Sequence, residues 1–415
     1  MRFSTLAEWL SWQETLHPSK IDMDLDRVRY VADVMELRRP ASVTVTVAGT
    51  NGKGSSVAFL TAILHEAGYR VGTYTSPHVF RYNERVVIDG QPAADGLLCD
   101  AFRRIDAARG DTTLTYFEFG TLAALDVFQS SGLDVAVLEV GLGGRLDAVN
   151  VVDADCALIT GIGIDHVAWL GEDREQIGAE KAAIFRSNRP AVCGDARPPA
   201  SLLAAALEIE AKLFVRGKDF DAVLREGDWD WKAEQGEWPA LPKPALPGSF
   251  QIDNAAAVLM TLDCLRDVLP VPRAAIDAGL QNVSLPGRLQ ICEGSVQRIF
   301  DVAHNPQAAA AVADYLASQG RKGTTRVVLG MLADKDVAGV FAALKDQVDK
   351  WYLGSVQDER GLEARELARR AALDASCFES LPAAYRQALA EAMPGDRIVV
   401  TGSFVGVAQV LATLQ

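Results

Sequence analysis

The feature that most constrains this fold is an alternation of β-branched runs with glycine turns and helical patterns. Residues 43–47 (VTVTV) and 135–140 (VAVLEV) have the pattern of buried strands, and a glycine-rich turn follows each one. Further strands are expected at residues 70–74, 156–160 and 190–193, and helices at residues 55–67, 119–129 and 201–212. Because strands that alternate with helices pair in parallel, we predict an α/β domain built on a parallel sheet.

The pattern changes between residues 214 and 250. Trp229, Trp231 and Trp238 alternate with polar residues there, and a proline-rich stretch (PALPKPALPG) follows, which predicts a small antiparallel β insert at about 214–250. Alternation resumes after residue 285, with strands expected at residues 297–302, 325–330, 350–353 and 397–401. We therefore predict a first domain over residues 1–285 that carries the insert, and a Rossmann-like α/β domain over residues 286–415.

Composition excludes several classes of protein. Lysine and arginine number 41 against 55 aspartates and glutamates, and a net charge of −14 offers no general attraction for nucleic acid. The six cysteines form no C-x-x-C pair, which argues against a zinc ribbon or a disulfide framework and favours a reducing compartment. No signal peptide and no run of apolar residues long enough to span a membrane is expected. We expect a cytoplasmic protein that acts as a monomer, with no nucleic-acid or membrane partner.

A glycine loop connects the strand at residues 43–47 to the next helix. Glycines let backbone N–H groups approach a polyphosphate, and the helix N-terminus and a lysine add positive potential. The loop departs from G-x-x-x-x-G-K-[ST], since Val47 replaces the first glycine and Gly54 separates Lys53 from Ser55. A glycine turn that only joins strand to helix is the structural alternative. We predict a P-loop-type nucleotide site formed by Thr50, Asn51, Gly52, Lys53, Gly54 and Ser55.

Three more polar side chains belong to the same predicted sheet. Glu139 ends a strand at the edge where open α/β sheets bind ligands, and it could reach a nucleotide-bound Mg²⁺; a locally capped glutamate is the alternative. His166 follows the next strand through two glycines and reaches the same edge, although a lone histidine is often structural. Lys181 lies on a helix with an apolar face, and its position alone predicts a solvated lysine paired with a carboxylate.

Eight motifs occur in order over almost the whole chain. They are GTNGKGS at residues 49–55, TSPHVFRYNERV at 75–86, EVGLGGRLDAVN at 139–150, DH at 165–166, AEKAAIFR at 179–186, DNAAAVL at 253–259, LPGRLQ at 285–290 and DVAHNP at 301–306. Together they resemble the folylpolyglutamate synthase/dihydrofolate synthase family of the Mur-ligase superfamily. The resemblance implies an ATP-binding Mur-ligase-like first domain and a C-terminal glutamate-ligase domain.

The resemblance also implies a reaction and its metal ions. In this family ATP phosphorylates a substrate carboxylate, and the amino group of L-glutamate attacks the acyl phosphate. By motif, Ser76 and Glu139 would hold one Mg²⁺, and Glu139, His166 and Lys181 would serve a second. Lys181 would be carbamylated (N6-carboxylysine), which turns a cation into an oxygen ligand. The residues that the resemblance makes catalytic are Lys53, Glu139, His166, Lys181 and Arg288.

Further roles come from the later motifs. Asn254 would contact adenine, Arg288 the γ-phosphate and Asp301 the ribose, while His304 and Asn305 would lie near the ribose or the incoming glutamate. The structural alternatives are a hinge arginine that bonds to backbone for Arg288 and a helix N-cap for Asp301.

The pterin side of the resemblance rests on three segments. The residues concerned are Ile21, Asp22, Met23 and Asp24, then Thr115, Tyr116, Phe117 and Glu118, and finally Leu146, Asp147 and Ala148. Aromatic rings there could pack against the flat pterin, and a carboxylate could pair with its N–H edge. Asp24 departs from the family, which has a glycine at that position. The alternative is that Phe117 and Phe119 are core residues and Glu118 is a helix-start charge.

These observations predict an ATP-dependent carboxylate–amine ligase. It would add L-glutamate to dihydropteroate, making dihydrofolate, and to the γ-carboxylate of tetrahydrofolate and its glutamates, as a tetrahydrofolylpolyglutamate synthase. The main alternative is a folylpolyglutamate synthase only, and a Mur-type ligase of peptidoglycan precursors is a second. A regulatory GTPase would need an N-K-x-D motif, and Asp334-Lys335-Asp336 lacks the asparagine. A non-catalytic ATP-gated binding protein would share the fold but would not need the metal ligands.

Overall fold

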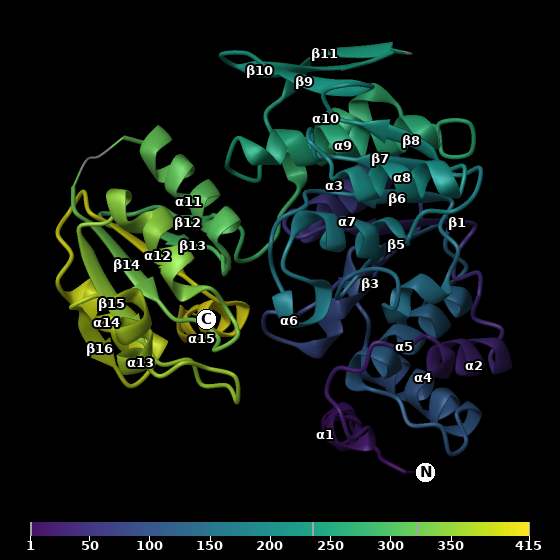
Figure 1. Ribbon diagram of the computed structural model, residues 1–415, viewed down its shortest axis with the longest axis horizontal. Coiled ribbons are helices and arrows are strands. Elements are labelled where there is room, and N and C mark those ends of the chain that lie inside the picture. Colours follow the sequence, from purple (N-terminus) through teal and green to yellow (C-terminus); the bar gives the residue numbers. More distant parts are fainter. Residues whose placement is uncertain (1, 235, 321–322, 415) are drawn as a thin grey trace. The chain divides into compact units, whose positions relative to one another are not determined.

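The chain divides into two compact units in the computed structural model, which describes residues 2–234, 236–320 and 323–414 (Figure 1). The first unit contains the chain up to Ala245 and Ile252–Val283. The second unit contains Leu246–Gln251 and the chain from Ser284 onward. Each unit has its own sheet and its own core.

An eight-stranded sheet forms the centre of the first unit, in the order β4-β3-β2-β5-β1-β6-β7-β8. Its strands are β1 (Val43–Ala48), β2 (Val71–Tyr74), β3 (Val86–Ile88), β4 (Gln91–Pro92), β5 (Val135–Glu139), β6 (Cys156–Ile159), β7 (Pro190–Cys193) and β8 (Lys212–Val215). From β2 to β8 the strands are parallel, whereas β3 and β4 add an antiparallel edge. The predicted parallel α/β architecture is confirmed.

Helices cover this sheet because its central strands are apolar on both faces. Every residue of β1 is buried. The helices of this unit are α1 (Leu6–Leu16), α2 (Asp26–Val34), α3 (Lys53–Glu66), α4 (Asp95–Ala108), α5 (Tyr116–Ser131), α6 (Val167–Leu170), α7 (Arg174–Ala182), α8 (Ala200–Glu208), α9 (Phe250–Cys264) from Ile252 onward, and α10 (Arg273–Asn282). Short 3₁₀ turns occur at η1 (Tyr82–Arg85) and η2 (Ala148–Val151). Trp9, Phe102 and Phe119 are fully buried in the main core.

The small insert is a separate three-stranded antiparallel sheet, with strands β9 (Phe220–Leu224), β10 (Asp228–Ala233) and β11 (Gly236–Pro242). Trp231 is buried, and its indole N–H donates to the carbonyl of Ala256 on α9, 3.1 Å away. The antiparallel sheet begins later than the predicted limit of 214, because Phe214 pairs with Val192 as part of the parallel strand β8. Its other predicted limit, residue 250, is the first residue of α9.

The second unit contains a six-stranded sheet in the order β12-β13-β17-β14-β15-β16. Its strands are β12 (Gln290–Cys292), β13 (Gln297–Phe300), β14 (Thr325–Leu329), β15 (Lys350–Gly354), β16 (Ser376–Phe378) and β17 (Arg397–Thr401). The strands are parallel except for β12, which pairs antiparallel with β13. Its helices are α11 (Pro306–Ser318), α12 (Val337–Leu344), α13 (Ala364–Ala371), α14 (Leu381–Ala390) and α15 (Phe404–Leu411), with 3₁₀ turns η3 (Lys345–Gln347) and η4 (Ala412–Leu414).

No helix within the described residues combines the length and the hydropathy that a membrane span needs.

Candidate functional site

Four strands of the first unit end at the same edge of the sheet. The register pairs Val47 with Glu139 and Ala48 with Ile159, so the ends of β1, β5 and β6 are neighbours. β2 ends beside β5, where Tyr74 pairs with Leu138. Because parallel strands present their carboxyl ends together, the loops that follow them form one cluster.

The glycine loop after β1 has a backbone that only glycine tolerates. Gly49 has φ of +149° and Gly52 has φ of +91°, and both values lie in the region that favours glycine. A Cβ on Gly49 would lie 1.9 Å from the Thr160 hydroxyl oxygen. Thr160 in turn donates to the carbonyl of Asn51, 2.6 Å away. The loop is therefore fixed against the residues that follow β6.

Thr50 makes a second connection between these two loops. Its backbone N–H donates to the carbonyl of Gly161 at 2.7 Å. Its hydroxyl donates to the carbonyl of Gly163 at 2.9 Å and accepts from the N–H of Gly163 at 3.0 Å. The phosphate loop and the segment that leads to His166 are thus one rigid assembly. A rigid loop of this kind presents backbone N–H groups without further ordering, as a phosphate site requires.

Two lysine amines converge on the carbonyl of Gly49. Lys53 Nζ donates to it at 2.9 Å, and Lys181 Nζ donates to it at 3.1 Å from α7. Lys181 is only 3% exposed, so it is not the solvated lysine that its helical position alone predicts. Burial and the charge of Lys53 lower the pKa of Lys181 to about 7. Near neutral pH a substantial fraction of this amine is therefore unprotonated.

Gly144 explains how α7 comes close enough to bury Lys181. A Cβ on Gly144 would lie 2.7 Å from the carbonyl oxygen of Glu180 and 3.1 Å from the Cα of Lys181. Any larger residue would push the loop after β5 away from α7. The glycine motif at residues 141–144 therefore has a packing function at this helix.

Glu139 and Ser76 are brought together at the ends of β5 and β2. Glu139 is 5% exposed, and its Oε2 accepts from the backbone N–H of Ser76 at 3.3 Å. A carboxylate and a hydroxyl at one strand edge are hard oxygen donors of the kind that Mg²⁺ prefers. Ser76 and Glu139, which are predicted from the sequence to hold one Mg²⁺, therefore lie close together.

His166 lies at the start of α6, next to Asp165. It has φ of 53°, and its backbone N–H donates to Asp165 Oδ1 at 2.7 Å. Asp165 also contributes to the pKa of Lys181, which places its charge near the buried amine. His166 is partly exposed, in contrast to Lys181.

Within the described residues, no three His, Cys, Asp or Glu side chains gather as a metal site would require. The predicted ligands include only two of these types, Glu139 and His166, with a serine hydroxyl and a lysine completing the set. An unmodified lysine would be either a cation or an amine and would not supply an oxygen. The second predicted set, Glu139, His166 and Lys181, offers a hard divalent cation a second oxygen-bearing side chain only if Lys181 carries a carboxylate.

Asn254, on α9, lies against the phosphate loop. A Cβ on Gly52 would be 2.5 Å from its side-chain oxygen. This contact joins two residues that are about 200 positions apart in the sequence. Asn254 is therefore placed beside the loop where the resemblance puts a nucleotide.

The three predicted pterin segments meet along the loop that follows β5. The ring of Phe117 lies over Gly141, where a Cβ would be 2.5 Å from its Cζ. The methyl of Met23 lies near Gly143, 3.5 Å from the position of a Cβ there. Tyr74 and Phe117 have ring centroids 6.0 Å apart. Phe119, two residues further along the chain, is fully buried. It is therefore a core residue, which is the alternative to a pterin contact.

Asp147 is buried and holds its own loop in shape. Its Oδ2 accepts from the N–H of Leu142 at 2.8 Å, and its Oδ1 accepts from the N–H of Val149 at 2.9 Å. Burial raises the pKa of Asp147 to about 6. Its neighbour Leu146 is half-buried and Ala148 is buried. Asp147 thus bonds to the same loop that Phe117 and Met23 contact.

Arg27 connects the N-terminal segment to α5, and sequence reasoning did not find it. Its guanidinium donates to Glu118 Oε1 and to Asp22 Oδ2, both at 2.9 Å. Glu118 also forms a capping box with Thr115 at the start of α5. This agrees with the alternative that Glu118 is a charge at the start of a helix. Asp24, which replaces the family glycine, accepts from the N–H of Asp26 at 2.9 Å and pairs with Arg27 at 3.3 Å.

Tyr116 is the remaining aromatic residue of the second pterin segment. Its ring packs edge-on against Tyr82, and the Arg85 guanidinium lies 5.6 Å from its centroid. Burial raises its pKa. Tyr116 is therefore part of an aromatic cluster beside Phe117.

In the second unit, Arg288, His304 and Phe404 form a cluster. The Arg288 guanidinium lies 4.7 Å from the centroid of Phe404, and the His304 ring lies 5.8 Å from the same ring. Stacking holds the flat guanidinium in one orientation. Sequence reasoning missed Phe404, since no local pattern connects α15 to the LPGR motif.

Asp301 and Asn305 have different structural functions in this unit. Asp301 is 7% exposed and accepts from the N–H groups of Leu289 and Ala303, each at 2.8 Å, and burial raises its pKa. The N-cap of α11 is Asn305, whose Oδ1 accepts from the N–H of Ala308 at 2.9 Å. The structural alternative made Asp301 a helix N-cap. The residue that caps the helix is Asn305.

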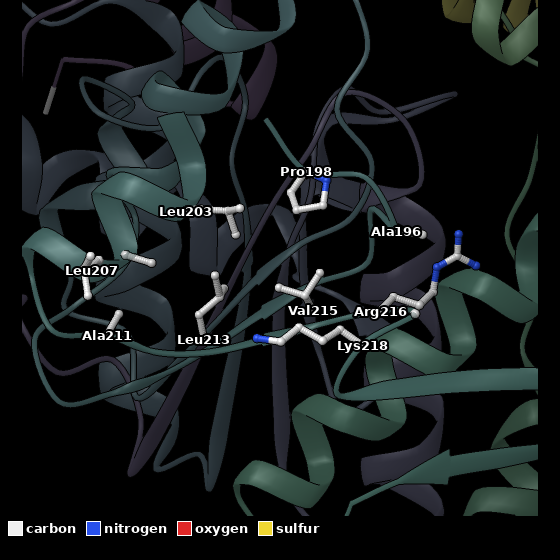
Figure 2. Close-up of a pocket in the computed structure, with 11 residues that line it drawn as sticks. Ala196, Pro198, Leu203, Leu207, Ala211, Leu213, Val215, Arg216 and Lys218 are labelled. Atoms are coloured by element: carbon white, nitrogen blue, oxygen red, sulfur yellow. The ribbon is translucent and has the colours of Figure 1, made fainter. Parts of the chain in front are cut away.

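A separate pocket of about 470 Å³ lies at the β8 edge of the first unit (Figure 2). Leucines of α8 and β8 line it together with Arg216 and Lys218. Arg216 forms an ion pair with Asp253. Its eleven lining residues include no predicted site residue, so it is distinct from the cluster at the strand ends.

Comparison with known proteins identifies the family. The Mur ligase middle domain matches residues 47–262, and the Mur ligase glutamate ligase domain matches residues 287–404. The chain is 44% identical over 411 residues to the dihydrofolate synthase/folylpolyglutamate synthase of Escherichia coli (strain K12), covering 99% of this chain and 96% of that protein. The chain belongs to the dihydrofolate synthase/folylpolyglutamate synthase family. The family expected from the eight motifs is confirmed.

Solved structures agree with this assignment. The E. coli FolC structure in complex with DHPP and ADP has a TM-score of 0.96 and 44% identity, covering 100% of this chain and 98% of that one. A bifunctional folylpolyglutamate synthase/dihydrofolate synthase with Mn, AMPPNP and L-glutamate bound has a TM-score of 0.94 and 45% identity, covering 100% and 99%. Family members of this fold thus bind a nucleotide, a divalent metal and L-glutamate.

Proposed function

We propose that this chain catalyses the ATP-dependent addition of L-glutamate to dihydropteroate and to the γ-carboxylate of folate glutamates, through an acyl phosphate. A phosphoryl group passes from ATP to the substrate carboxylate, the glutamate nitrogen attacks the carbonyl carbon, and phosphate leaves. Two of its relatives are named as both dihydrofolate synthase and folylpolyglutamate synthase, which supports this function. The substrates would be dihydropteroate, tetrahydrofolate and its glutamates, L-glutamate and ATP, and the chain would act as a monomer. The cytoplasmic location stays a prediction from composition.

One observation carries the proposal. The rigid glycine loop, the two converging lysines and the Glu139–Ser76 pair lie at one sheet edge, and the three pterin segments lie along the loop that begins beside Glu139. Phosphoryl transfer between two anions requires such a phosphate cradle and positive charge, held in line with the substrate carboxylate. A cradle next to an aromatic-lined segment suits a pterin acid as the acceptor.

We assign two Mg²⁺ ions to this edge, the first held by Ser76 and Glu139 and the second by Glu139, His166 and Lys181. When bound, the ions would neutralise phosphate charge during transfer. Carbamylation of Lys181 would form a bond between its nitrogen and the carbon of CO₂ and release one proton. Its burial beside Gly49 and Gly144 supports this modification, because a buried amine in that place has no solvent to stabilise its charge.

The remaining roles follow the same assignment. Lys53 and the backbone N–H groups of residues 50–55 would hold the phosphates, and Asn254 would contact adenine. Arg288 would bind the γ-phosphate and Asp301 the ribose, with His304 and Asn305 near L-glutamate. The stacking of Arg288 on Phe404 supports a fixed guanidinium. We assign residues 1–285 to an ATP-binding and pterin-binding domain and residues 286–415 to a glutamate-ligase domain.

The experiment that tests this function measures phosphate release from ATP with Mg²⁺ and L-glutamate, and weighs the products by mass spectrometry. Dihydropteroate, tetrahydrofolate and a mixture without a pterin are compared. Glutamate added to both pterins supports the dual enzyme. Addition to tetrahydrofolate alone would leave a folylpolyglutamate synthase, and the Asp24 substitution would then mark the lost activity. An enzyme that turns over neither pterin, but joins an amino acid to a nucleotide-linked acid, would be a Mur-type ligase instead.

The pH dependence of pterin binding tests the role of Asp147. Its pKa is raised to about 6, so the carboxyl gains a proton as the pH falls below that value. A protonated carboxyl is a weaker acceptor for the pterin N–H groups, so KM for dihydropteroate should rise about tenfold between pH 7 and pH 5, whereas KM for ATP should not follow the same curve. Asp147→Asn should give a raised KM for dihydropteroate that no longer follows this titration. A wild-type KM that stays flat over this range would contradict the assignment.

A further inference from the structure

Arg216, which follows β8 directly, forms an ion pair with the helix that carries Asn254. Its Nη1 contacts Oδ1 of Asp253, in the first turn of α9. The Arg216 side chain is 18% exposed, and its guanidinium extends away from the leucines of the pocket (Figure 2). The charged end of Arg216 is therefore directed at α9 and not at the apolar lining.

The backbone of Arg216 is held on two sides. Its N–H donates to the carbonyl of Cys193, at the end of β7, at 2.9 Å. On the other side Arg216 pairs with Phe220 of the insert, and the N–H of Gly217 donates to the Phe220 carbonyl at 2.8 Å. The guanidinium therefore projects from a fixed junction between the parallel sheet and the insert.

The residues of α9 that follow Asp253 are packed closely as well. Trp231 of the insert donates its indole N–H to the carbonyl of Ala256 at 3.1 Å. A Cβ on Gly194, which follows β7, would lie 3.2 Å from the Cβ of Ala257. Close-packed segments transmit small shifts instead of absorbing them. A shift at Asp253 would therefore reach its neighbour Asn254, whose Oδ1 and Nδ2 would lie 2.5 Å and 3.3 Å from a Cβ on Gly52.

The charges around Asp253 show why a cation is needed there. Burial and the charge of Asp221, on β9, raise the pKa of Asp253, whereas the charge of Arg216 lowers it. Without Arg216, two neighbouring carboxylates would repel each other at the start of α9. Loss of this arginine should therefore push the first turn of α9 out of place.

We propose that Arg216 is a positioning residue for the nucleotide, which holds Asp253 and through it keeps Asn254 beside the phosphate loop. This inference rests on the nucleotide assignment of the proposed function and extends it by two residues that act through Asn254. The antiparallel insert, to which the proposed function gives no task, then helps to support the nucleotide site.

The test measures nucleotide affinity in the full-length enzyme. Arg216→Ala should raise Kd for ADP and KM for ATP about fivefold, the upper end of what a partly exposed ion pair contributes, with little change in kcat or in KM for dihydropteroate and L-glutamate. Arg216→Lys should recover most of the loss, because its ammonium restores a cation opposite Asp253. Adding Asp253→Ala to Arg216→Ala should weaken ADP binding no further, since both residues act through one contact.

Arg225→Ala is the matched control, because Arg225 forms another arginine–aspartate ion pair, with Asp230, inside the insert. It should bind ADP as wild type does. Unchanged ADP affinity in Arg216→Ala, or an equal loss in Arg225→Ala, would overturn the inference. A rise of KM for all three substrates, together with a lower melting temperature, would do the same. A wild-type enzyme that binds ADP but adds glutamate to no pterin would instead overturn the proposed function and leave this inference standing.

Discussion

Replacing Lys181 with alanine should lower kcat/KM about a thousandfold, with little change in the melting temperature. Residues that stabilise charge in a transition state typically contribute factors of this size when they are removed. The side chain is buried and donates to Gly49 rather than packing in the core, so its loss should affect catalysis more than stability. The measurement is steady-state phosphate release with dihydropteroate, ATP and L-glutamate, together with thermal unfolding of both proteins.

The carbamate assignment predicts additional results for the same variant. Wild-type protein equilibrated with ¹³CO₂ should show a carbamate carbon signal that Lys181→Ala lacks. A short carboxylate such as acetate should restore part of the activity of Lys181→Ala, because it supplies the missing oxygen ligand. Lys345→Ala, at an exposed lysine, is the control and should keep full activity. Full activity of Lys181→Ala in protein stripped of CO₂ would refute the assignment.

Replacing Gly49 with alanine should lower kcat/KM at least about a hundredfold, since small displacements of catalytic groups have effects of this size. Its φ of +149° is unfavourable for alanine, and the new Cβ would lie 1.9 Å from the Thr160 hydroxyl oxygen. Relief of this overlap has to move the loop or Thr160, and Thr160 also bonds to Asn51. The same carbonyl of Gly49 receives both lysine amines, so their positions change as well.

The matched control for this variant is Gly161→Ala in the adjoining loop. A Cβ on Gly161 would have Asn51 O as its nearest neighbour, 4.0 Å away, so the substitution fits without displacement. Titration with ADP should show weaker binding to Gly49→Ala and wild-type binding to Gly161→Ala. Equal nucleotide affinity in Gly49→Ala and wild type would contradict the assignment of this loop to the phosphates.

Much of the architecture was predictable because the signals are local. β1 is a buried run of valine and threonine followed by a glycine turn, and the end of β5 is marked by Glu139 at the end of an apolar run. Parallel pairing then places the ends of neighbouring strands at one edge, so the closeness of Glu139 to the glycine loop follows from topology. The family resemblance added roles to these residues that periodicity alone does not supply.

Other features were not predictable because they depend on residues that are distant in the chain. Phe214 lies at the end of a helix-like stretch, but it joins β8 because β7 offers a free edge. Arg27 and Glu118 are 91 residues apart, and their ion pair forms only when the N-terminal segment packs against α5. Phe404 comes beside Arg288 through the packing of the second unit.

Lys181 shows most clearly what each level decides. The local pattern places a lysine on a helix with an apolar face, after the strands of a nucleotide-binding sheet. Its burial comes from long-range packing, because Gly144 lets α7 approach and Gly49, 132 residues away, accepts its hydrogen bond. Burial beside Lys53 then lowers its pKa to about 7. Periodicity sets which local element forms, whereas desolvation by distant segments sets the charge and the chemistry of a side chain.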